Sequence, residues 1–458
     1  MMLPKIFERF AEGSPVTVLL RGILEHALPA AEIDQLFAAT AEQQYTRELL
    51  FSSVVDLMAE VVCRIRPSVH AGYQAEPRKF GVSLRAVYDK LEHTEPGISA
   101  ALVAHTGRKL IPVIQRLGGG LPPWLRDYRV RILDGNHLAG TEHRLKELRT
   151  LAAGALPGQT LAVLDAATMV VTDVLCCEDG HAQERALLPD IFPRIAERDL
   201  WVADRNFCTT DFWFALATRR AFGVLRQHGN LSWQPRSKRR YVGRVDTGRV
   251  YEQRVRIRDD TGQELPLRRI TVQLDTPTRD GDAEIHILTN LPAQVRAKVI
   301  ARLYQKRWTI ETAFQELTVI LKCEVNTLAY PKAALLGFCV ALMAFNVLSA
   351  VKAALRAAHG AEKIEEVLST YYLAEEIAGT YRGMMIAIPE GSWEVFATMT
   401  TARFAKALME LASKVVLEKL KKHPRGPKKP KPRRHRDRHV THVATARILA
   451  KRKAASTK

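Results

Sequence analysis

The stretch "LYQKRWTIE", residues 303–311, places one carboxylate, Glu311, directly after two aromatic residues and two cations. On a helical wheel of about 100° per residue, Tyr304, Arg307 and Glu311 share one face. That face borders an apolar stripe that we expect to be buried. One interpretation is a surface ion pair between residues four apart on a helix, and the other is a chemical site. The apolar stripe consists of Ile310, Phe314, Leu317 and Leu321.

Two aspartates have matching positions further upstream. Asp134 ends the strand-like run "RVRILD" and Asp204 ends "LWVAD", each just before turn residues. If the two strands are neighbours, both carboxylates meet at one sheet edge, where Glu311 can reach them from a helix packed on the sheet. Asp165, in "TLAVLDAAT", is a rival for Asp134 but lies in the middle of its run.

Three carboxylates this close repel one another unless cations neutralise them. Oxygen ligands suit Mg²⁺, which binds through a few carboxylates together with substrate phosphates. Two Mg²⁺ ions about 3.5–4 Å apart, with Mn²⁺ as an alternative, activate the attacking oxygen and stabilise the leaving oxygen at phosphorus. The chemistry predicted from the three acids is therefore phosphoryl transfer on a nucleic-acid backbone.

The blocks "DGNH", "ADRNF" and "YQKRWTIE" occur in this order. With them the chain resembles bacterial insertion-sequence transposases of the DDE class, specifically the insertion-sequence-four family with its Tyr-x2-Arg-x3-Glu-x6-Lys signature. The resemblance covers roughly residues 124 to 350. It implies an RNase H-like fold, a metal-binding catalytic triad of Asp134, Asp204 and Glu311, and phosphate contacts from Tyr304 and Arg307.

The chain departs from this signature at one position, because Thr318 stands where the lysine is expected. Lys322 lies one helical turn later, and we expect its ammonium group to reach the same phosphate. Two tryptophans are further candidates for DNA contact. Trp308 either shields the site, stacks on a base or packs in the core, and Trp233 either stacks on a displaced base or has a structural role.

The order of segments predicts an α/β protein with an RNase H-like mixed sheet, a β-rich insertion and a helical N-terminal domain. "GGGLPP", residues 118–123, breaks any helix and is a predicted domain boundary. The expected units are a helical DNA-end-binding domain (1–117), the first part of the catalytic domain (124–228), the β-rich insertion (229–288), the second part with C-terminal helices (289–418) and a basic disordered tail (419–458).

The net charge of +19 is concentrated in this tail, which carries 16 Lys/Arg against Asp437 alone and thus +15. A run of cations with Pro and Gly is typical of a disordered segment that binds a polyanion. Binding to phosphates through such a run weakens with salt and carries no sequence specificity. Nucleic acid, a membrane surface or plain solvation remain open for the tail.

Other classes of function lack their motifs. The sequence contains no GxSxG, no Walker loop and no GxGxxG, so acyl transfer and nucleotide-driven work have no support. Six cysteines without CxxC spacing indicate reduced thiols and no zinc module. The apolar run at 333–351 is predicted to be a buried core helix, and no membrane role is expected. We expect a cytoplasmic, nucleoid-associated protein.

The predicted function is a metal-dependent DNA transposase that acts on double-stranded DNA. The enzyme would cut the terminal inverted repeats of its element by water attack and join the freed 3′-OH to target DNA, as a homodimer holding two ends. Two alternatives remain: an RNase H-like nuclease that does not join strands, and a non-catalytic DNA-binding relic.

Overall fold

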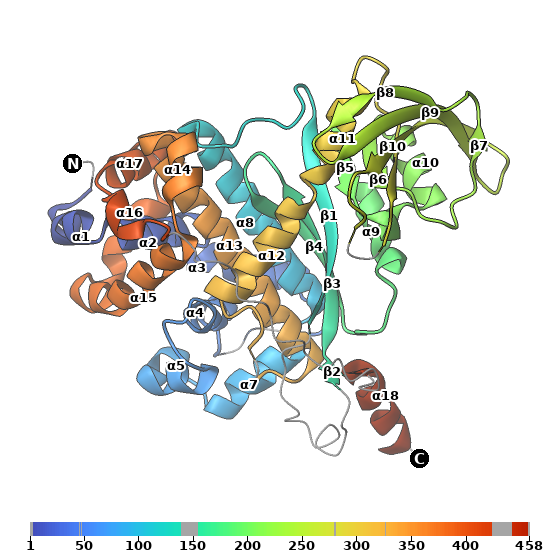
Figure 1. Ribbon diagram of the computed structural model, residues 1–458. Coiled ribbons are helices and arrows are strands. Elements are labelled where there is room, and N and C mark those ends of the chain that lie inside the picture. The colour runs from blue at the N-terminus through green and yellow to red at the C-terminus, as the bar shows by residue number, and fades with distance from the viewer. Residues whose placement is uncertain are drawn as a thin grey trace.

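In the computed structural model of the protein, helices form one side of the molecule and a long mixed sheet the other (Figure 1). The structure describes residues 3–44, 46, 48–138, 154–278, 281–325, 327–423 and 442–456. The predicted mixed α/β architecture with a helical N-terminal region is confirmed.

The N-terminal region contains only helices up to Leu117 within its described residues. Ser83 caps one of them, because its hydroxyl accepts a hydrogen bond from the Ala86 N–H. The helices are η1 (Lys5–Phe7), α1 (Glu8–Gly13), α2 (Pro15–Ala27), α3 (Ala30–Thr40), α4 (Phe51–Val62), α5 (Val69–Ala75), α6 (Pro77–Phe80), α7 (Leu84–His93) and α8 (Pro96–Leu117).

Two glycines of the "GGGLPP" run end α8 and let the chain pass a neighbouring helix. Gly118 has a left-handed backbone with φ of 67°, the conformation that favours glycine after a helix. A Cβ on Gly119 would lie 2.0 Å from the Ala353 carbonyl oxygen. The Gly119 carbonyl also accepts a hydrogen bond from Arg356 Nε at 2.7 Å.

The first five strands of the long sheet lie in the order β4-β3-β1-β5-β6. β3 is antiparallel to both β1 and β4, whereas β5 is parallel to β1 and β6 is parallel to β5. Their bounds are β1 (Arg129–Leu138), β3 (Gly158–Asp165), β4 (Val170–Cys177), β5 (Asp199–Ala203) and β6 (Phe222–Arg226).

Both faces of this sheet are covered, as the wholly buried β5 illustrates. Val202 belongs to the large core shared with α8 and α13, whereas Trp201 belongs to a second core on the opposite face. That second core includes Phe212 and Trp213 of α10 (Thr210–Thr218). Thr209 caps α10, because its hydroxyl accepts a hydrogen bond from the Phe212 N–H.

The stretch "ERALLPDIFPRIAE", residues 184–197, has the sequence pattern of a single helix, but the chain forms no continuous helix there. Three short segments replace it: η2 (Glu184–Leu187), α9 (Leu188–Ile191) and η3 (Phe192–Arg194). Pro189 and Pro193 each stand within the first two positions of a new segment. Proline lacks the N–H that an uninterrupted helix needs, so each proline starts a new turn.

The residues between 229 and 288 form strands that extend the same sheet past β6, in the order β11-β10-β9-β7, with β8 paired to β9. β9 and β10 pair over eleven residues each and form the lobe at the upper right of Figure 1. The bounds are β7 (Gln234–Pro235), β8 (Arg240–Val245), β9 (Gly248–Arg258), β10 (Glu264–Leu274) and β11 (Glu284–Thr289).

The C-terminal half returns to helices. These are α11 (Ala297–Gln305), α12 (Trp308–Ile320), α13 (Pro331–His359), α14 (Ala361–Val367), α15 (Thr370–Ala387), η5 (Glu390–Trp393), α16 (Glu394–Ala397), α17 (Thr401–Ser413) and η6 (Leu417–Leu420). α13 and α17 pack on α2 and α8, and Phe7 contacts Trp393 edge to face. The N-terminal helices therefore share one core with the C-terminal helices and do not pack alone.

α13 is the one helix in the described part of the chain that is long and apolar enough to cross a membrane, and its most apolar stretch is completely buried in the protein. Its polar residues bind the edge strand β4. Asn346 accepts a hydrogen bond from the Val171 N–H and donates one to the Val171 carbonyl, and Ser349 donates to the Met169 carbonyl. α13 is therefore a core helix, as its interrupted apolar run predicted.

The C-terminal segment differs from the predicted disordered tail in its last part. Residues 442–456 form β12 (His442–Ala444), which pairs with β2 (Gly154–Leu156), and α18 (Thr445–Ser456). Arg447 donates to the Asp179 carboxylate, and Ile448 packs against Ala329. These contacts with residues far away in the sequence give an otherwise hydrophilic segment a fixed place. The most basic part of the predicted tail, residues 424–441, lies outside the described residues.

Candidate active site

The sheet brings Asp134 and Asp204 to the same level of two adjacent parallel strands. The last paired residues of β1 and β5 are Leu133 and Ala203, and each aspartate follows one of them. We had predicted that Asp134 ends its strand, and this is wrong. β1 continues to Leu138 through its pairing with β3. Only the pairing with β5 stops at Asp134, which leaves its carboxylate beside the turn that follows β5.

Local hydrogen bonds fix both carboxylates. Asp134 Oδ1 accepts from the Gly135 N–H at 3.1 Å. Asp204 caps the short helix η4 (Arg205–Phe207), and its Oδ1 accepts from the Asn206 N–H at 2.7 Å. Each aspartate is thus held by the backbone that immediately follows it.

Glu311 lies in the first turn of α12, which packs against β1. The single helix assumed for residues 304–321 is wrong: α11 ends at Gln305 and α12 begins at Trp308. Between them, Lys306 and Arg307 keep helical angles but bond three residues back, which tightens the turn. The predicted apolar stripe nevertheless faces the core, with Ile310, Leu317 and Leu321 buried and Phe314 partly buried.

Arg307 lies between two of the three acids. Its Nη1 is 3.4 Å from Asp134 Oδ2 and its Nη2 donates to Glu311 Oε1 at 2.6 Å. The Arg307 side chain is 12% exposed and that of Glu311 is 46% exposed. The ion pair between Arg307 and Glu311, four residues apart on a helix, is therefore present as one interpretation predicted. It lies beside Asp134, however, because Arg307 contacts both acids. Arg307, predicted to contact phosphate, has carboxylate partners in this structure.

The pKa of the Asp134 carboxyl reflects this environment. Burial, as the largest cause, raises its pKa to about 7 from an ordinary 3.8. The Arg307 charge lowers the pKa, whereas the charges of Asp204 and Glu311 raise it further. The Arg307 guanidinium therefore does not offset the combined effect of burial and the neighbouring carboxylates on Asp134.

The aromatic residues near Arg307 differ in exposure. Tyr304 is partly buried at the end of α11, and burial raises the pKa of its hydroxyl to about 12 against the effect of Arg307. Trp308 is 61% exposed, so core packing does not explain it. Trp233 is partly buried, and the Arg269 guanidinium covers its ring at 4.7 Å.

The predicted replacement of the signature lysine fails on geometry. α12 ends at Ile320 and Leu321 is extended, so Lys322 does not continue the helix face of Glu311. Lys322 Nζ instead donates to the Pro67 carbonyl at 2.8 Å, and its backbone N–H bonds to Val62. Thr318 is exposed on α12, and its hydroxyl donates back to the Phe314 carbonyl.

Three further polar side chains, of Glu184, Asn206 and His137, lie beside the aspartates. Glu184 Oε2 accepts from Asn206 Nδ2 at 2.7 Å, and Glu184 Oε1 is 3.5 Å from His137 Nε2. The rival Asp165 has other partners, because it accepts two hydrogen bonds from Thr168 and pairs with Arg131 at 3.3 Å. No local sequence signal marks Glu184, which is 50 residues from Asp134.

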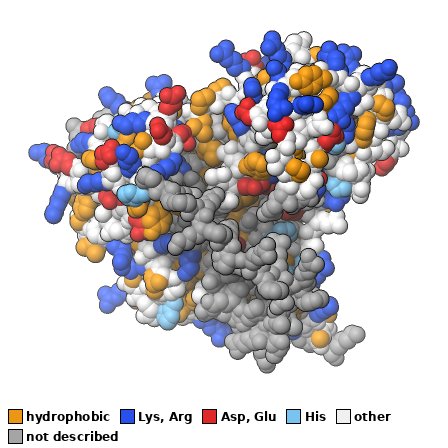
Figure 2. Space-filling view, in the orientation of Figure 1, with side chains coloured by type: hydrophobic (Ala, Val, Ile, Leu, Met, Phe, Trp, Pro, Cys, Tyr) orange, Lys and Arg blue, Asp and Glu red, His pale blue; other side chains and the backbone are white. Residues whose placement is uncertain are grey.

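Lys and Arg side chains gather over the lobe formed by β7 to β10 (Figure 2). Several of them pair with acids, such as Arg239 with Glu284 at 2.8 Å. Among the residues that the structure describes, Lys238, Arg249 and Arg254 have no ion-pair partner. The exposed cations of this lobe are Arg236, Lys238, Arg239, Arg240, Arg244, Arg249, Arg254 and Arg258.

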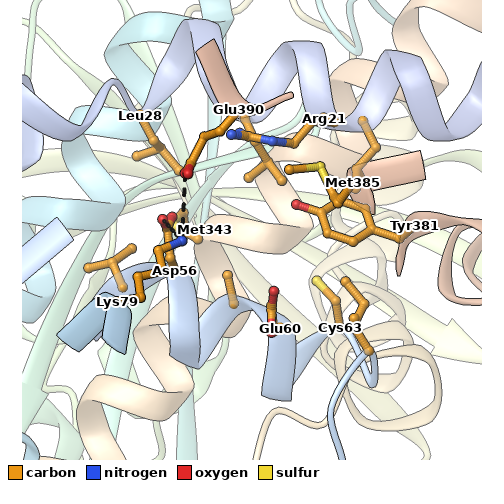
Figure 3. Close-up of a pocket in the computed structure, with 15 residues that line it drawn as sticks. Arg21, Leu28, Asp56, Glu60, Cys63, Lys79, Met343, Tyr381, Met385 and Glu390 are labelled. Atoms are coloured by element: carbon orange, nitrogen blue, oxygen red, sulfur yellow. Dashed lines mark ion pairs between the residues drawn. The ribbon is translucent and has the colours of Figure 1, made fainter. Parts of the chain in front are cut away.

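A cavity of about 70 Å³ lies among the helices, away from the three acids (Figure 3). The charged side chains that line it form ion pairs with one another or with neighbouring residues. Lys79 lies 3.6 Å from both Asp56 and Glu390, and Arg21 pairs with Glu25 at 2.7 Å. None of the predicted site residues lines it. We interpret this cluster as a structural link between α2, α4 and the C-terminal helices.

Comparison with known proteins addresses the family. Residues 125–347 match the family model described as "Transposase DDE domain". A second match is to "Putative transposase y4zB" from Sinorhizobium fredii (strain NBRC 101917 / NGR234), with 33% identity over 126 residues. This match covers 27% of the chain and about a third (34%) of the relative's length. Both comparisons support a DDE transposase.

Proposed function

We propose that the chain is a DNA transposase of the insertion-sequence-four family, in which Asp134, Asp204 and Glu311 carry out phosphoryl transfer. The observation that carries this proposal is the arrangement of the three acids. Two follow the last paired residues of adjacent parallel strands, and the third shares Arg307 with one of them. The match of this segment to the transposase DDE domain supports the same reading.

We infer an RNase H-like fold for the catalytic domain from the sheet. Three antiparallel strands followed by two parallel strands, in the order β4-β3-β1-β5-β6, support that topology. Under this proposal, residues 124–228 and 289–418 form the catalytic domain, with the strands of 229–288 inserted between them. Residues 1–117 recognise the element's ends, and the most basic tail residues add affinity for DNA.

The donor set partly fits a divalent metal ion. Asp134 and Asp204 offer hard oxygen ligands of the kind that Mg²⁺ prefers, and the pKa of Asp134 is raised by burial and, to a lesser extent, by the charges of Asp204 and Glu311. In the described part of the chain no three His, Cys, Asp or Glu side chains are close enough to hold a metal ion. Glu311 therefore has to leave Arg307 to complete the site. When bound, two such ions would activate the attacking oxygen and stabilise the leaving one.

DNA contacts are proposed for the surface around the acids. Trp308 is exposed next to Arg307, and the lobe of β7 to β10 presents cations without ion-pair partners among the described residues. Phosphate contacts position a nucleic acid without reading its sequence. We propose that this lobe and Tyr304 hold the DNA backbone. Trp233 can stack on a base only if Arg269 moves away from its ring. We further propose that a homodimer holds the two DNA ends.

The test is cleavage of duplex DNA that carries the inverted repeats flanking the gene. Asp134→Ala, Asp204→Ala and Glu311→Ala should each abolish Mg²⁺-dependent nicking while end binding remains, because metal ligands act in the chemical step. Asp211→Ala, which removes an exposed acid on α10, is the matched control. Nicking that survives in a folded triad variant would remove that residue from the site.

The same assay separates the alternatives. Strand joining to a second DNA distinguishes a transposase from a nuclease that only cuts. A chain that binds the ends but does not cleave them with Mg²⁺ or Mn²⁺ is the non-catalytic relic. The departure at Thr318 gives the relic its one specific support.

A further inference from the structure

Glu184 is a fourth carboxylate at the site, and the proposed function leaves it without a role. It begins η2, and its side chain is 18% exposed. One carboxylate oxygen accepts a hydrogen bond from Asn206 Nδ2 at 2.7 Å. The other lies 3.5 Å from His137 Nε2. Both partners belong to the segments that carry the aspartates.

The Glu184 carboxylate lies directly over the backbone that follows Asp134. A Cβ built on Gly135 would be 2.3 Å from Glu184 Oε1 and 2.5 Å from Glu184 Cδ. Any side chain at this position would therefore displace the carboxylate. Gly135 is also the residue whose N–H bonds to Asp134 Oδ1.

On its other side, Glu184 holds the residue that orients Asp204. Asn206 donates its side-chain N–H to Glu184 and its backbone N–H to Asp204 Oδ1 at 2.7 Å. We propose that Glu184 is a positioning residue, which fixes the spacing between Asp134 and Asp204. This inference rests on the proposed function, because it concerns the same pair of acids.

Glu184 is itself held by the sheet. Gln159 of β3 is completely buried, and its Nε2 donates to the Ala182 carbonyl at 2.7 Å. Gln159 is also the partner of His137 in the β1–β3 register. In addition, η2 packs against β3 and η4. The Glu184 carboxylate therefore has a rigid support, as a positioning residue requires.

Residues that orient metal-binding side chains are typically worth about 10–100-fold in metal affinity or activity. Glu184→Ala should lower the cleavage rate by about that factor and raise the Mn²⁺ concentration needed for half-maximal rate. Glu184→Gln keeps an oxygen that accepts from Asn206, so we expect it to retain most of the rate. Mn²⁺ affinity, measured on the DNA-free protein by electron paramagnetic resonance, should fall in the same order.

An exchanged pair tests the contact with Asn206. Asn206→Asp alone places two carboxylates against each other and should reduce the rate at least as much as Glu184→Ala. The double variant Glu184→Gln with Asn206→Asp restores the hydrogen bond with donor and acceptor exchanged. It should recover much of the loss, a result that general destabilisation would not produce.

Glu197→Gln is the matched control, because Glu197 is 62% exposed and only faces Arg220 at 3.6 Å. Unchanged rate and Mn²⁺ requirement in Glu184→Ala, or no recovery in the exchanged pair, would overturn the inference alone. A wild-type chain that does not cleave DNA refutes the proposed function instead. In that case Mn²⁺ affinity still decides the inference, and equal affinities in wild type and Glu184→Ala overturn it.

Discussion

Replacing Asp134 by Asn should make the metal-free protein more stable at pH 8. The carboxyl has a pKa of about 7 in the folded chain against an ordinary 3.8. The folded state therefore binds more protons than the unfolded state between these values, and the free energy of unfolding falls as pH rises through this window. Asn keeps the acceptor for the Gly135 N–H but carries no charge.

The magnitude follows from the same pKa difference. Each pKa unit corresponds to about 1.36 kcal/mol, so removing the charge yields at most about 4 kcal/mol at pH 8. The lost attraction to Arg307, 3.4 Å away, is already included in the native pKa. Below about pH 4 both side chains are neutral, and the difference between the two proteins should vanish.

The assay is urea unfolding of wild type and Asp134→Asn with a metal chelator, at pH 5 and pH 8. Asp165→Asn is the matched control: Asp165 is also buried, but it accepts two hydrogen bonds from Thr168 and pairs with Arg131. It should lose about 1–3 kcal/mol at both pH values. An Asp134→Asn protein no more stable than wild type at pH 8 would refute the raised pKa of Asp134 in the folded chain.

Three further predictions concern the remaining DNA-contact candidates. Truncation after His423, which keeps the buried Leu420, should lower non-specific DNA affinity and flatten its salt dependence. The slope of log affinity against log salt concentration should fall by about 0.9 for each lost phosphate contact. An unchanged slope means that the tail does not touch DNA. Lys322→Ala should reduce the free energy of unfolding by about 1 kcal/mol, because the hydrogen bond to the Pro67 carbonyl is lost. Cleavage by the folded protein should be unchanged. Slower cleavage would mean that Lys322 takes part in the site. Trp308→Ala should weaken end binding at unchanged melting temperature, whereas Trp233→Ala should lower the melting temperature because its ring is partly buried under Arg269.

Local sequence patterns were sufficient to predict the strands before both aspartates and the buried stripe of α12. Runs of buried β-branched residues and an apolar period of 3.6 depend only on nearby residues. The runs before the two aspartates are buried at Leu133 and Ala203, and the helical period placed Glu311 beside the core.

Long-range contacts decided what the sequence could not predict. β1 continues beyond Asp134 because β3 pairs with it, and Lys322 turns away from α12 because Val62 and Pro67 bind it. Glu184 reaches Asn206 only through the fold of the segment between β4 and β5. The defined structure of residues 442–456 likewise depends on the pairing of β12 with β2, almost 290 residues earlier in the sequence.

Arg307 accounts for how three acids can lie together in a protein without metal. Its guanidinium reaches both Asp134 and Glu311 and lowers the pKa of Asp134, but burial, together with the charges of Asp204 and Glu311, keeps that pKa high. Under the proposed function, divalent ions would supply positive charge to the carboxylates, and binding them would release Glu311 and the Arg307 guanidinium from each other. The side chain that pairs with the acids in the metal-free chain is also the one assigned to a DNA phosphate. The two roles would then follow one another and not compete, because Arg307 would be free for a phosphate once its carboxylate partners held metal.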